Sequence, residues 1–331
     1  MSDPLQAAAR SVEQGRVEEA LATLHRAGDA GNADALTRLA TWYLSGTIVA
    51  RDLPAARTLL RRAAELGHAD AALVEIALTA NGSGAEPDWK AAVQRLRHAA
   101  LRDPLAAQYL QLLEQMSLRE DGTPADLPRP TVLHPGPRIQ RFAQFCTPDE
   151  CVHIASLAAA SLQPATVFDP GSGKMIAHPV RNSDNAVIGP TQETLVVQAI
   201  NQRIAAATAT QVVQGEPLAV LRYGPGQQYR PHLDTLTGEP NQRIRTAILY
   251  LNHNYSGGET AFPLLGLKIA PRVGDLLVFD NVDAHGASDP NSRHAGLPIT
   301  SGTKWIATRW LRAEPTTPWL LSAQARAAAQ A

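Results

Sequence analysis

Two histidines and an aspartate form a set of side chains that could bind one metal ion. His232 and Asp234 are separated by a single residue, and His294 follows much later in the chain. Two histidines and one carboxylate are the ligand set of mononuclear non-haem iron(II) centres, where they occupy one face of the metal. Positions 232 and 234 of a β-strand point to the same side, so both side chains can reach one ion. The pattern predicts an iron centre whose open face can take up dioxygen.

Short apolar runs surround these residues between positions 220 and 312. The runs cover residues 220–223, 246–251, 275–279 and 304–311, and glycine, proline, asparagine or aspartate bounds them. Short runs of this kind, without long helical patterns between them, predict an antiparallel sandwich or barrel. A sheet closed upon itself would bring the distant His294 back to the His-x-Asp pair.

Lys304 is predicted to lie inside this sheet. It stands ten positions after His294, and strand alternation places it on the same face as the apolar Ile306. A lone buried ammonium is costly unless an anion supplies the countercharge. 2-Oxoglutarate fits, because its keto acid end chelates iron and its far carboxylate needs a cation. Tyr223 and Thr246 are expected to add hydroxyl donors to that carboxylate; the alternative is that Lys304 reaches the surface from a strand end.

Sequence blocks around these residues resemble the catalytic domain of prolyl 4-hydroxylases. The blocks occur in family order within residues 138–312: YGPGQQYRPHLD at 223–234, RIRTAILYL at 243–251, GGETAFP at 257–263, GD at 274–275, HAGLP at 294–298 and GTKW at 302–305. The resemblance implies a double-stranded β-helix (jelly-roll) domain with flanking helices. It also implies an Fe(II)- and 2-oxoglutarate-dependent dioxygenase that uses O2, with ascorbate as reductant.

The same resemblance implies roles for particular residues. The implied iron ligands are His232, Asp234 and His294, and the implied 2-oxoglutarate residues are Lys304, Tyr223 and Thr246. A family loop of the Val-Arg-Thr-Ser type folds over the bound peptide. The matching stretch from position 180 keeps Arg181 and Ser183 but has Asn182 in place of threonine. Tyr229 and Trp310 stand where family members place aromatic walls around the target ring, with ordinary core packing as the alternative.

A second histidine competes with His294 for the role of third ligand. His285 follows Asp283 and precedes His294 by nine positions. The spacing between His294 and Lys304 and the Gly-Leu-Pro sequence after it favour His294. The aspartate at position 234 also excludes halogenases of this superfamily, which leave that ligand position vacant for a halide.

The first third of the chain repeats itself with a period of 36 residues. This shift aligns alanines and leucines in three copies: Ala20, Ala56 and Ala92; Leu24, Leu60 and Leu96; Ala27, Ala63 and Ala99. A fixed period in this range predicts a helical solenoid whose units bury their faces on one another. The pattern resembles tetratricopeptide-like repeats of the Sel-one class, which implies a concave surface for protein segments. A purely structural role is the alternative.

These patterns divide the chain into four parts. They are an all-α helical-repeat domain of residues 1–118, a Pro-rich linker of residues 119–137, the oxygenase domain of residues 138–315 and an alanine-rich tail of residues 316–331, for which a short helix is predicted. Within the oxygenase domain, Thr147, Pro148 and Glu150 predict a capped helix start. A second helix is expected over residues 192–207.

Composition argues against several classes of partner. The 30 lysine and arginine residues balance 31 aspartate and glutamate residues without a basic stripe, so no nucleic acid is expected. No apolar stretch of membrane-spanning length and no signal-peptide pattern occur, so no membrane association is expected. With Cys146 and Cys151 as its two cysteines, the chain has no disulfide framework, which favours a cytoplasmic location.

Taken together, these expectations describe a cytoplasmic hydroxylase of a prolyl residue in a peptide or protein, with the repeats helping to recruit the substrate. One alternative is a hydroxylase of a free amino acid or small metabolite, in which the repeats are structural. The other is a catalytically inactive protein-binding module.

Overall fold

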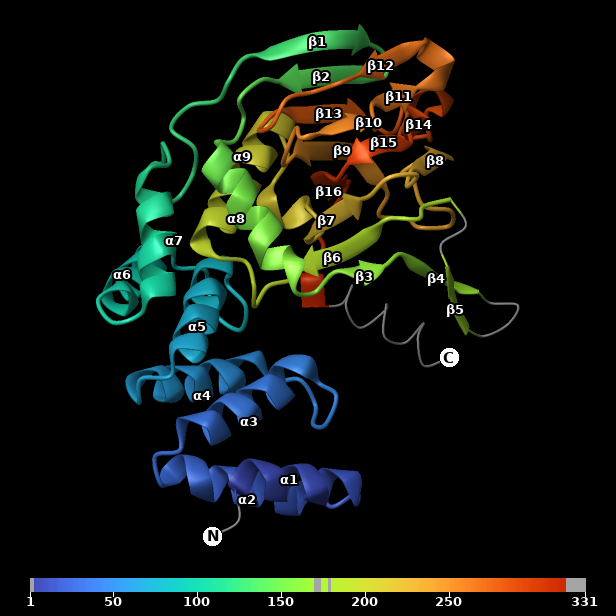
Figure 1. Cartoon of the computed structure of the whole chain (residues 1–331). Coiled ribbons are helices and arrows are strands. Elements are labelled where there is room, and N and C mark those ends of the chain that lie inside the picture. The colour runs from blue at the N-terminus through green and yellow to red at the C-terminus, as the bar shows by residue number, and fades with distance from the viewer. Residues whose placement is uncertain (1–2, 170–173, 178–179, 320–331) are drawn as a thin grey trace. The chain divides into compact units, whose positions relative to one another are not determined.

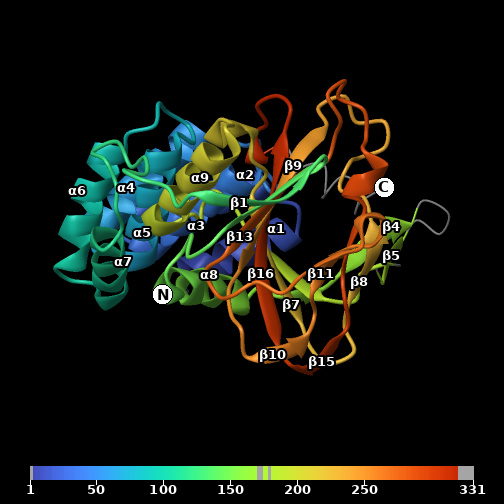
Figure 2. The same cartoon turned by 90° about the horizontal axis from the view of Figure 1, so that it is seen from above.

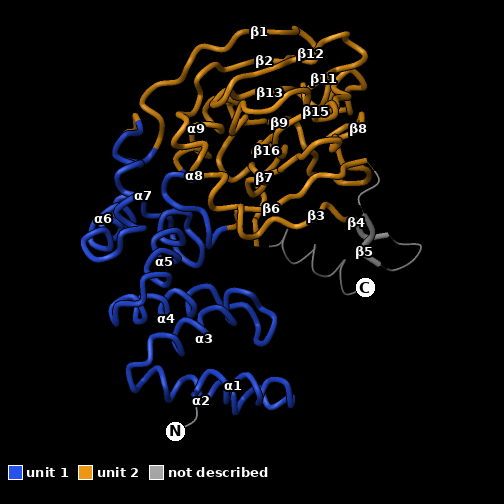
Figure 3. The backbone as a smooth tube through the Cα atoms, in the orientation of Figure 1, with its two compact units in different colours: residues 1–116, 120–122, 190–198 blue, residues 117–119, 123–189, 199–331 orange. Residues whose placement is uncertain are grey.

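The computed structural model describes residues 3–169, 174–177 and 180–319 (Figure 1). The chain divides into two compact units (Figure 3): residues 1–116, 120–122 and 190–198 form the first, and residues 117–119, 123–189 and 199–331 form the second. The first boundary lies close to the predicted boundary at residue 118. The predicted tail helix falls mostly on residues 320–331, outside the described residues.

Helix pairs build the first unit. They are α1 (Pro4–Glu13), α2 (Val17–Asp29), α3 (Ala33–Ser45), α4 (Leu53–Glu65), α5 (Ala69–Asn81), α6 (Trp89–Ala100) and α7 (Pro104–Glu114). Helices α2, α4 and α6 start at Val17, Leu53 and Trp89, so the structure shows the predicted 36-residue repeat as a repeated helix pair. The side chains of Asp52 and Asp88 accept backbone hydrogen bonds at the starts of α4 and α6, which fixes where each helix begins. The predicted helical-repeat domain is confirmed.

Antiparallel sheets build the second unit. The larger sheet has the order β1 (Pro130–Pro135), β2 (Arg138–Phe142), β13 (Leu276–Asp280), β9 (Arg243–Tyr250), β16 (Lys304–Arg312), β7 (Leu218–Tyr223), β6 (Asp184–Ile188) and β3 (Gln163–Pro164). The smaller sheet has the order β12 (Leu267–Ile269), β11 (Thr260–Phe262), β14 (His294–Gly296) and β8 (Tyr229–His232). Two two-stranded sheets complete the second unit: β10 (Tyr255–Gly257) pairs with β15 (Ile299–Gly302), and β4 (Thr166–Asp169) pairs with β5 (Lys174–Ala177). These sheets form the predicted jelly-roll.

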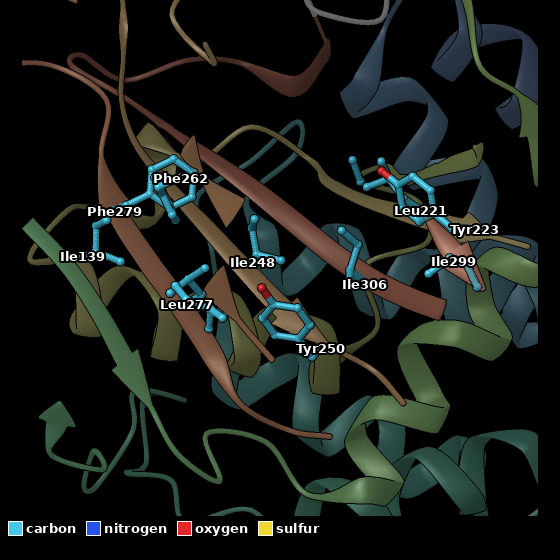
Figure 4. Close-up of a cluster of buried hydrophobic side chains, with 12 residues drawn as sticks. Ile139, Leu221, Tyr223, Ile248, Tyr250, Phe262, Leu277, Phe279, Ile299 and Ile306 are labelled. Carbon is cyan, nitrogen blue, oxygen red and sulfur yellow. The ribbon is translucent and has the colours of Figure 1, made fainter. Parts of the chain in front are cut away.

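The core lies between the two sheets. Figure 4 shows side chains from both sheets pointing toward one another, among them Ile248 and Ile306 of the larger sheet and Phe262 of the smaller one. Alternation along each strand directs these residues inward. Burial of one such side chain contributes about 1.5–3 kcal/mol, so this cluster fixes the spacing of the sheets around the site.

Helices α8 (Pro148–Ala159) and α9 (Leu195–Thr208) lie on one side of the larger sheet, and strands β8 and β11 lie on the other (Figure 2). The predicted capping box is present, because Glu150 N donates to Thr147 Oγ1 at 3.2 Å and Thr147 N donates to the Glu150 carboxylate at 3.0 Å. The same carboxylate accepts from Arg203 of α9 at 2.9 and 3.0 Å. This buried ion pair ties the two helices together. None of the described helices has the length and apolar character needed to cross a membrane.

The predicted linker of residues 119–137 is longer than the one in the structure. Residues from Pro130 to Pro135 form β1, which pairs with β2 at the edge of the larger sheet. The prolines suggested a connector, but an edge strand tolerates proline because one side of its backbone needs no partner. The sheet domain therefore starts at about residue 130 instead of residue 138.

The repeat unit should depend on a buried ion pair between α4 and α5. Glu75 is 2% exposed and accepts from Arg57 at 3.0 and 3.2 Å. Glu75→Ala would leave the Arg57 guanidinium buried without its countercharge, so we expect the free energy of unfolding to fall by about 3–5 kcal/mol. Urea unfolding of the full chain, followed by circular dichroism, measures this loss.

The matched control is Glu114→Ala. Glu114 is exposed and lies 4.0 Å from Arg97, so its loss should change the unfolding free energy by less than about 1 kcal/mol. Equal effects of the two substitutions would show that the buried pair does not hold the repeat unit together.

Candidate metal centre

The structure brings the three predicted iron ligands together. His232 ends β8, Asp234 follows two residues later, and His294 opens β14. Strands β8 and β14 are antiparallel neighbours in which His294 lies directly opposite His232. One ligand atom from each of the three side chains lies within 4.8 Å of the other two. The Asp234 carboxylate approaches His232 Nε2 at 3.5 Å and His294 Nε2 at 3.6 Å.

Backbone carbonyls orient both imidazole rings. The Nδ1 atom of His232 lies 2.8 Å from Arg230 O, and that of His294 lies 3.1 Å from Ser292 O. Because a carbonyl can only accept, each Nδ1 carries the proton and each Nε2 presents its lone pair to the centre. Burial lowers the pKa of His294 to about 4, which keeps its ring in the neutral form that binds metals.

The charge of Asp234 is also stabilised. Burial alone would raise its pKa, but His294, His232 and a hydrogen bond from Thr246 outweigh burial and hold the pKa below its usual range. The site therefore offers two imidazole nitrogens and one carboxylate oxygen. This donor set fits Fe(II), which His232, Asp234 and His294 would hold on one face.

Thr246 lies at the metal end of the cavity. Its hydroxyl donates to Asp234 Oδ2 at 2.5 Å and accepts from Asn281 Nδ2 at 2.9 Å. Thr246 pairs across the sheet with Trp310, which is six residues along β16 from Lys304. At about 3.3 Å per residue, this places Thr246 about 20 Å along the strand from the level of Lys304. Thr246 therefore orients an iron ligand. It does not lie beside Lys304, where it was expected to donate to the far carboxylate of 2-oxoglutarate.

Lys304 is buried at the opposite end of the same cavity. It is 3% exposed, which rules out the surface position considered as its alternative. Its ammonium donates to Gly258 O at 2.6 Å and lies 5.4 and 6.0 Å from the ring centroids of Tyr250 and Tyr223. Burial lowers the pKa of Lys304 to about 8, against the opposing influence of Glu259. An ammonium that contacts a carbonyl and two rings among the described residues is suited to an incoming carboxylate.

Thr260 also belongs to this end of the cavity, although it was not among the residues predicted from the sequence. Thr260 is buried, lines the cavity together with Lys304 and Tyr223, and shares a 2.6 Å hydrogen bond with the Tyr250 hydroxyl. It stands in the Gly-Gly-Glu-Thr block, and the alternation of Thr260 with Phe262 on β11 directs both inward. Burial raises the pKa of Tyr223, so its phenol stays protonated and can donate. Tyr223 and Thr260 therefore provide hydroxyl donors beside Lys304.

Aromatic rings line the cavity near the metal ligands, as predicted. The ring of Tyr229 stacks on His232 with centroids 3.5 Å apart, and the guanidinium of Arg181 lies 5.4 Å above the Tyr229 ring. Trp310 also lines the cavity, and Arg243 lies 4.1 Å from its ring centroid. These contacts fix the planes of both rings.

The segment from Arg181 to Ser183 lies beside β8. Asn182 Oδ1 accepts from Gln228 N at 2.7 Å, and Arg181 forms an isolated bridge with Tyr229. Asn182, where the chain departs from the family pattern, thus ties the segment to the strand that carries Tyr229. Ser183 is almost completely buried, and its contact with substrate stays a prediction.

The competing histidine lies outside the centre. His285 is exposed in a turn, where its backbone N donates to Asp283 Oδ1 at 2.8 Å. Among the described residues, the cluster able to hold a metal contains His294 and not His285. The preference for His294 agrees with this geometry.

Comparison with known proteins identifies the family. The model of the 2OG-Fe(II) oxygenase superfamily matches residues 218–312, the part of the chain that contains the triad and Lys304. The protein is a 2-oxoglutarate-dependent dioxygenase. Prolyl 4-hydroxylase 1 of Arabidopsis thaliana is 35% identical over 207 residues, which cover 57% of this chain and 73% of that protein. The chain belongs to the prolyl 4-hydroxylase family.

Two solved structures are also similar to this chain. The viral collagen prolyl hydroxylase of Paramecium Bursaria Chlorella virus-1, in its 2OG complex, is 29% identical with a TM-score of 0.44 and covers 53% of this chain and 96% of its own. A Sel1 repeat protein from Oxalobacter formigenes is 27% identical with a TM-score of 0.30 and covers 34% of this chain and 49% of its own.

Thr246 should control metal affinity. Thr246→Val removes the hydroxyl that bonds Asp234 and Asn281 while keeping the side-chain shape, so we expect Fe(II) affinity to fall by about 10–100-fold. Thr246→Ser retains the hydroxyl and should keep the affinity, as should His285→Ala. Calorimetric metal titration measures the effect. Equal affinity of the valine and serine variants would contradict this role.

Binding of 2-oxoglutarate should weaken at high pH. Lys304, with a pKa of about 8, is an ammonium below that pH and loses its charge above it. The affinity for 2-oxoglutarate should therefore fall as pH rises through about 8, by up to about tenfold per pH unit. Lys304→Met should lose most of the binding, about 3–5 kcal/mol, and this pH dependence with it. Calorimetric titrations between neutral and alkaline pH test this, and a wild-type affinity independent of pH would contradict it.

Proposed function

We propose that this protein hydroxylates a prolyl residue in a peptide or protein substrate. The observation that carries this proposal is the shared cavity, in which the His232, Asp234 and His294 triad lies at one end and the buried Lys304 at the other. The 35% identity with a prolyl 4-hydroxylase supports the choice of proline as the target.

The reaction would consume 2-oxoglutarate and O2, release succinate and CO2, and convert one C–H bond of the substrate into C–OH. The bound iron supplies the activation of dioxygen. Lys304, Tyr223 and Thr260 would grip the far carboxylate of the co-substrate and so fix the position of its keto acid end. Ascorbate would keep the iron in its ferrous form.

The substrate ring would be held by the aromatic side chains of the cavity. Tyr229 and Trp310 present flat faces beside the metal ligands, and Arg181 and Arg243 hold their ring planes. A pyrrolidine ring is compact and rigid, so flat faces can position one of its C–H bonds with little loss of conformational entropy. Glu216 accepts from Arg243 at 2.7 Å with each of its oxygens, which keeps this guanidinium over Trp310.

The repeat unit is proposed to help recruit the protein substrate. Arrays of helical repeats expose extended surfaces that suit protein segments. A cytoplasmic location is proposed as well, on the ground that Cys146 and Cys151 are both buried free thiols.

A coupled assay tests the hydroxylase. Purified protein with Fe(II), ascorbate and 2-oxoglutarate should convert proline-containing peptides to products heavier by one oxygen atom, with one succinate per hydroxylation. His232→Ala and Asp234→Ala should abolish both products because each removes a ligand, whereas His285→Ala should retain them. Mass spectrometry and succinate quantification give the readout.

The same assay separates the alternatives. Hydroxylation of free proline without hydroxylation of any peptide would favour the small-metabolite enzyme. If the wild-type protein forms no succinate and hydroxylates neither substrate, the prolyl hydroxylase proposal fails.

A further inference from the structure

The repeat unit carries a groove of about 490 Å³ that its own side chains leave open. Alanines from three helices line it: Ala64 of α4, Ala69 and Ala72 of α5, and Ala91 and Ala99 of α6. A methyl group leaves space where a longer side chain would fill the gap between helix pairs. The volume falls within the usual range of ligand sites.

Two of the three carboxylates in this groove are already engaged within the protein. Glu75 accepts both hydrogen bonds of the Arg57 pair, and Asp103 accepts from the first backbone N–H groups of α7 at 3.1 and 3.3 Å. The third, Glu65, is exposed in the last turn of α4. A ligand that enters the groove therefore meets one carboxylate, that of Glu65, that is not already engaged with described groups of the protein.

Two arginines of the groove, unlike Glu75 and Asp103, have no hydrogen-bond or ion-pair partner among the described residues. These are Arg95 and Arg102. Arg61 adds a third guanidinium, whose contact with Glu75 is 3.5 Å long. Guanidinium groups bind carboxylates through paired, planar hydrogen bonds. The cations still able to bind a partner thus outnumber the free carboxylate.

Two exposed leucines are sequence neighbours of residues that line the groove. Leu66 is 52% exposed and follows Glu65, and Leu101 is 78% exposed and precedes Arg102. Apolar side chains of this size gain free energy when a partner covers them. A free anion or a nucleic acid would satisfy the arginines but would leave these leucines in water.

We propose that this groove binds a protein segment in which acidic and apolar side chains alternate. Its carboxylates would pair with Arg95 and Arg102, and its apolar side chains would cover Leu66 and Leu101. This inference deepens the proposed function, because the segment would belong to the protein that carries the target proline. The groove selects the partner by charge, and the chemistry occurs in the sheet domain.

Peptide binding to the full chain tests the proposal. The probe is a short fluorescein-labelled peptide of alternating glutamate and leucine, and the matched peptide carries lysine in place of each glutamate. Fluorescence anisotropy is measured without iron, so that the result does not depend on hydroxylase activity. We expect the glutamate peptide to bind, the lysine peptide not to bind, and the affinity to fall with added salt because exposed ion pairs are screened.

Charge reversal locates the site. The double variant Arg95→Glu and Arg102→Glu should weaken binding by about tenfold or more, because two attractive contacts become repulsive. Arg97→Glu is the control, since Arg97 lies on α6 as Arg95 does, does not line the groove and pairs with Glu114. It should leave the affinity unchanged. Glu65→Gln should strengthen binding because it removes the free carboxylate of the groove.

Three results would overturn the proposal: no binding of the glutamate peptide, equal binding of both peptides, or an unchanged affinity in the double variant. Circular dichroism checks that each variant keeps its helices. Should the reversed pair lose them, Arg95→Gln with Arg102→Gln removes both charges with less disturbance, and unchanged binding there counts equally against the groove. Binding that persists in a protein without hydroxylase activity would support the groove and reject the proposed function separately.

Discussion

The antiparallel pairing of β8 with β14 is the constraint on which the rest of the site depends. It places His294 opposite His232 and so brings two distant parts of the chain to one ion. Because side chains alternate along a strand, a slip of one residue would turn His294 away from the cavity. The pairing of β14 with β11 on its other side holds that register and also fixes Thr260 at the far end of the cavity. One small sheet therefore positions both histidines at the metal end and Thr260 at the co-substrate end.

The two buried charges of the cavity are compensated in different ways. Asp234 accepts a hydrogen bond from the Thr246 hydroxyl, so the protein itself supplies a donor to this carboxylate. Lys304 has a backbone carbonyl and two aromatic rings but no carboxylate in hydrogen-bond contact among the described residues. A buried ammonium in this state remains unfavourable until an anion arrives. The dianionic co-substrate would supply the negative charge that this end of the cavity lacks. Because the fold already carries the free-energy cost of burying the Lys304 ammonium, relief of that cost would add to the affinity for the co-substrate.

The sequence predicted features that depend on local spacing. The His-x-Asp spacing keeps the two ligands near one another even though Asp234 lies in a bend beyond the end of β8, and not on the strand as expected. The 36-residue period needs only one helix pair per repeat, and the Thr147 cap is contained in four residues. Features set by cross-strand register were not predictable in the same way. Thr246 and Lys304 both lie on inward faces, but only the pairing of Thr246 with Trp310 reveals that they are at opposite ends of the cavity. Thr260 was overlooked for the same reason, and β1 was taken for a linker because its prolines carry no information about the sheet edge.

The repeat unit shows how a stable scaffold and a recognition surface can be told apart by their contacts. Arg57 is buried and bonded to Glu75 and Thr79, so its charge serves the packing of α4 against α5. Arg95 and Arg102 make no such bonds with the described residues, and exposed cations of this kind add little to folding stability. The exposed Leu66 and Leu101 likewise gain nothing from the fold itself. These side chains do not stabilise the unit, and they line or adjoin a groove whose walls include several alanines. A binding partner explains their position better than packing does.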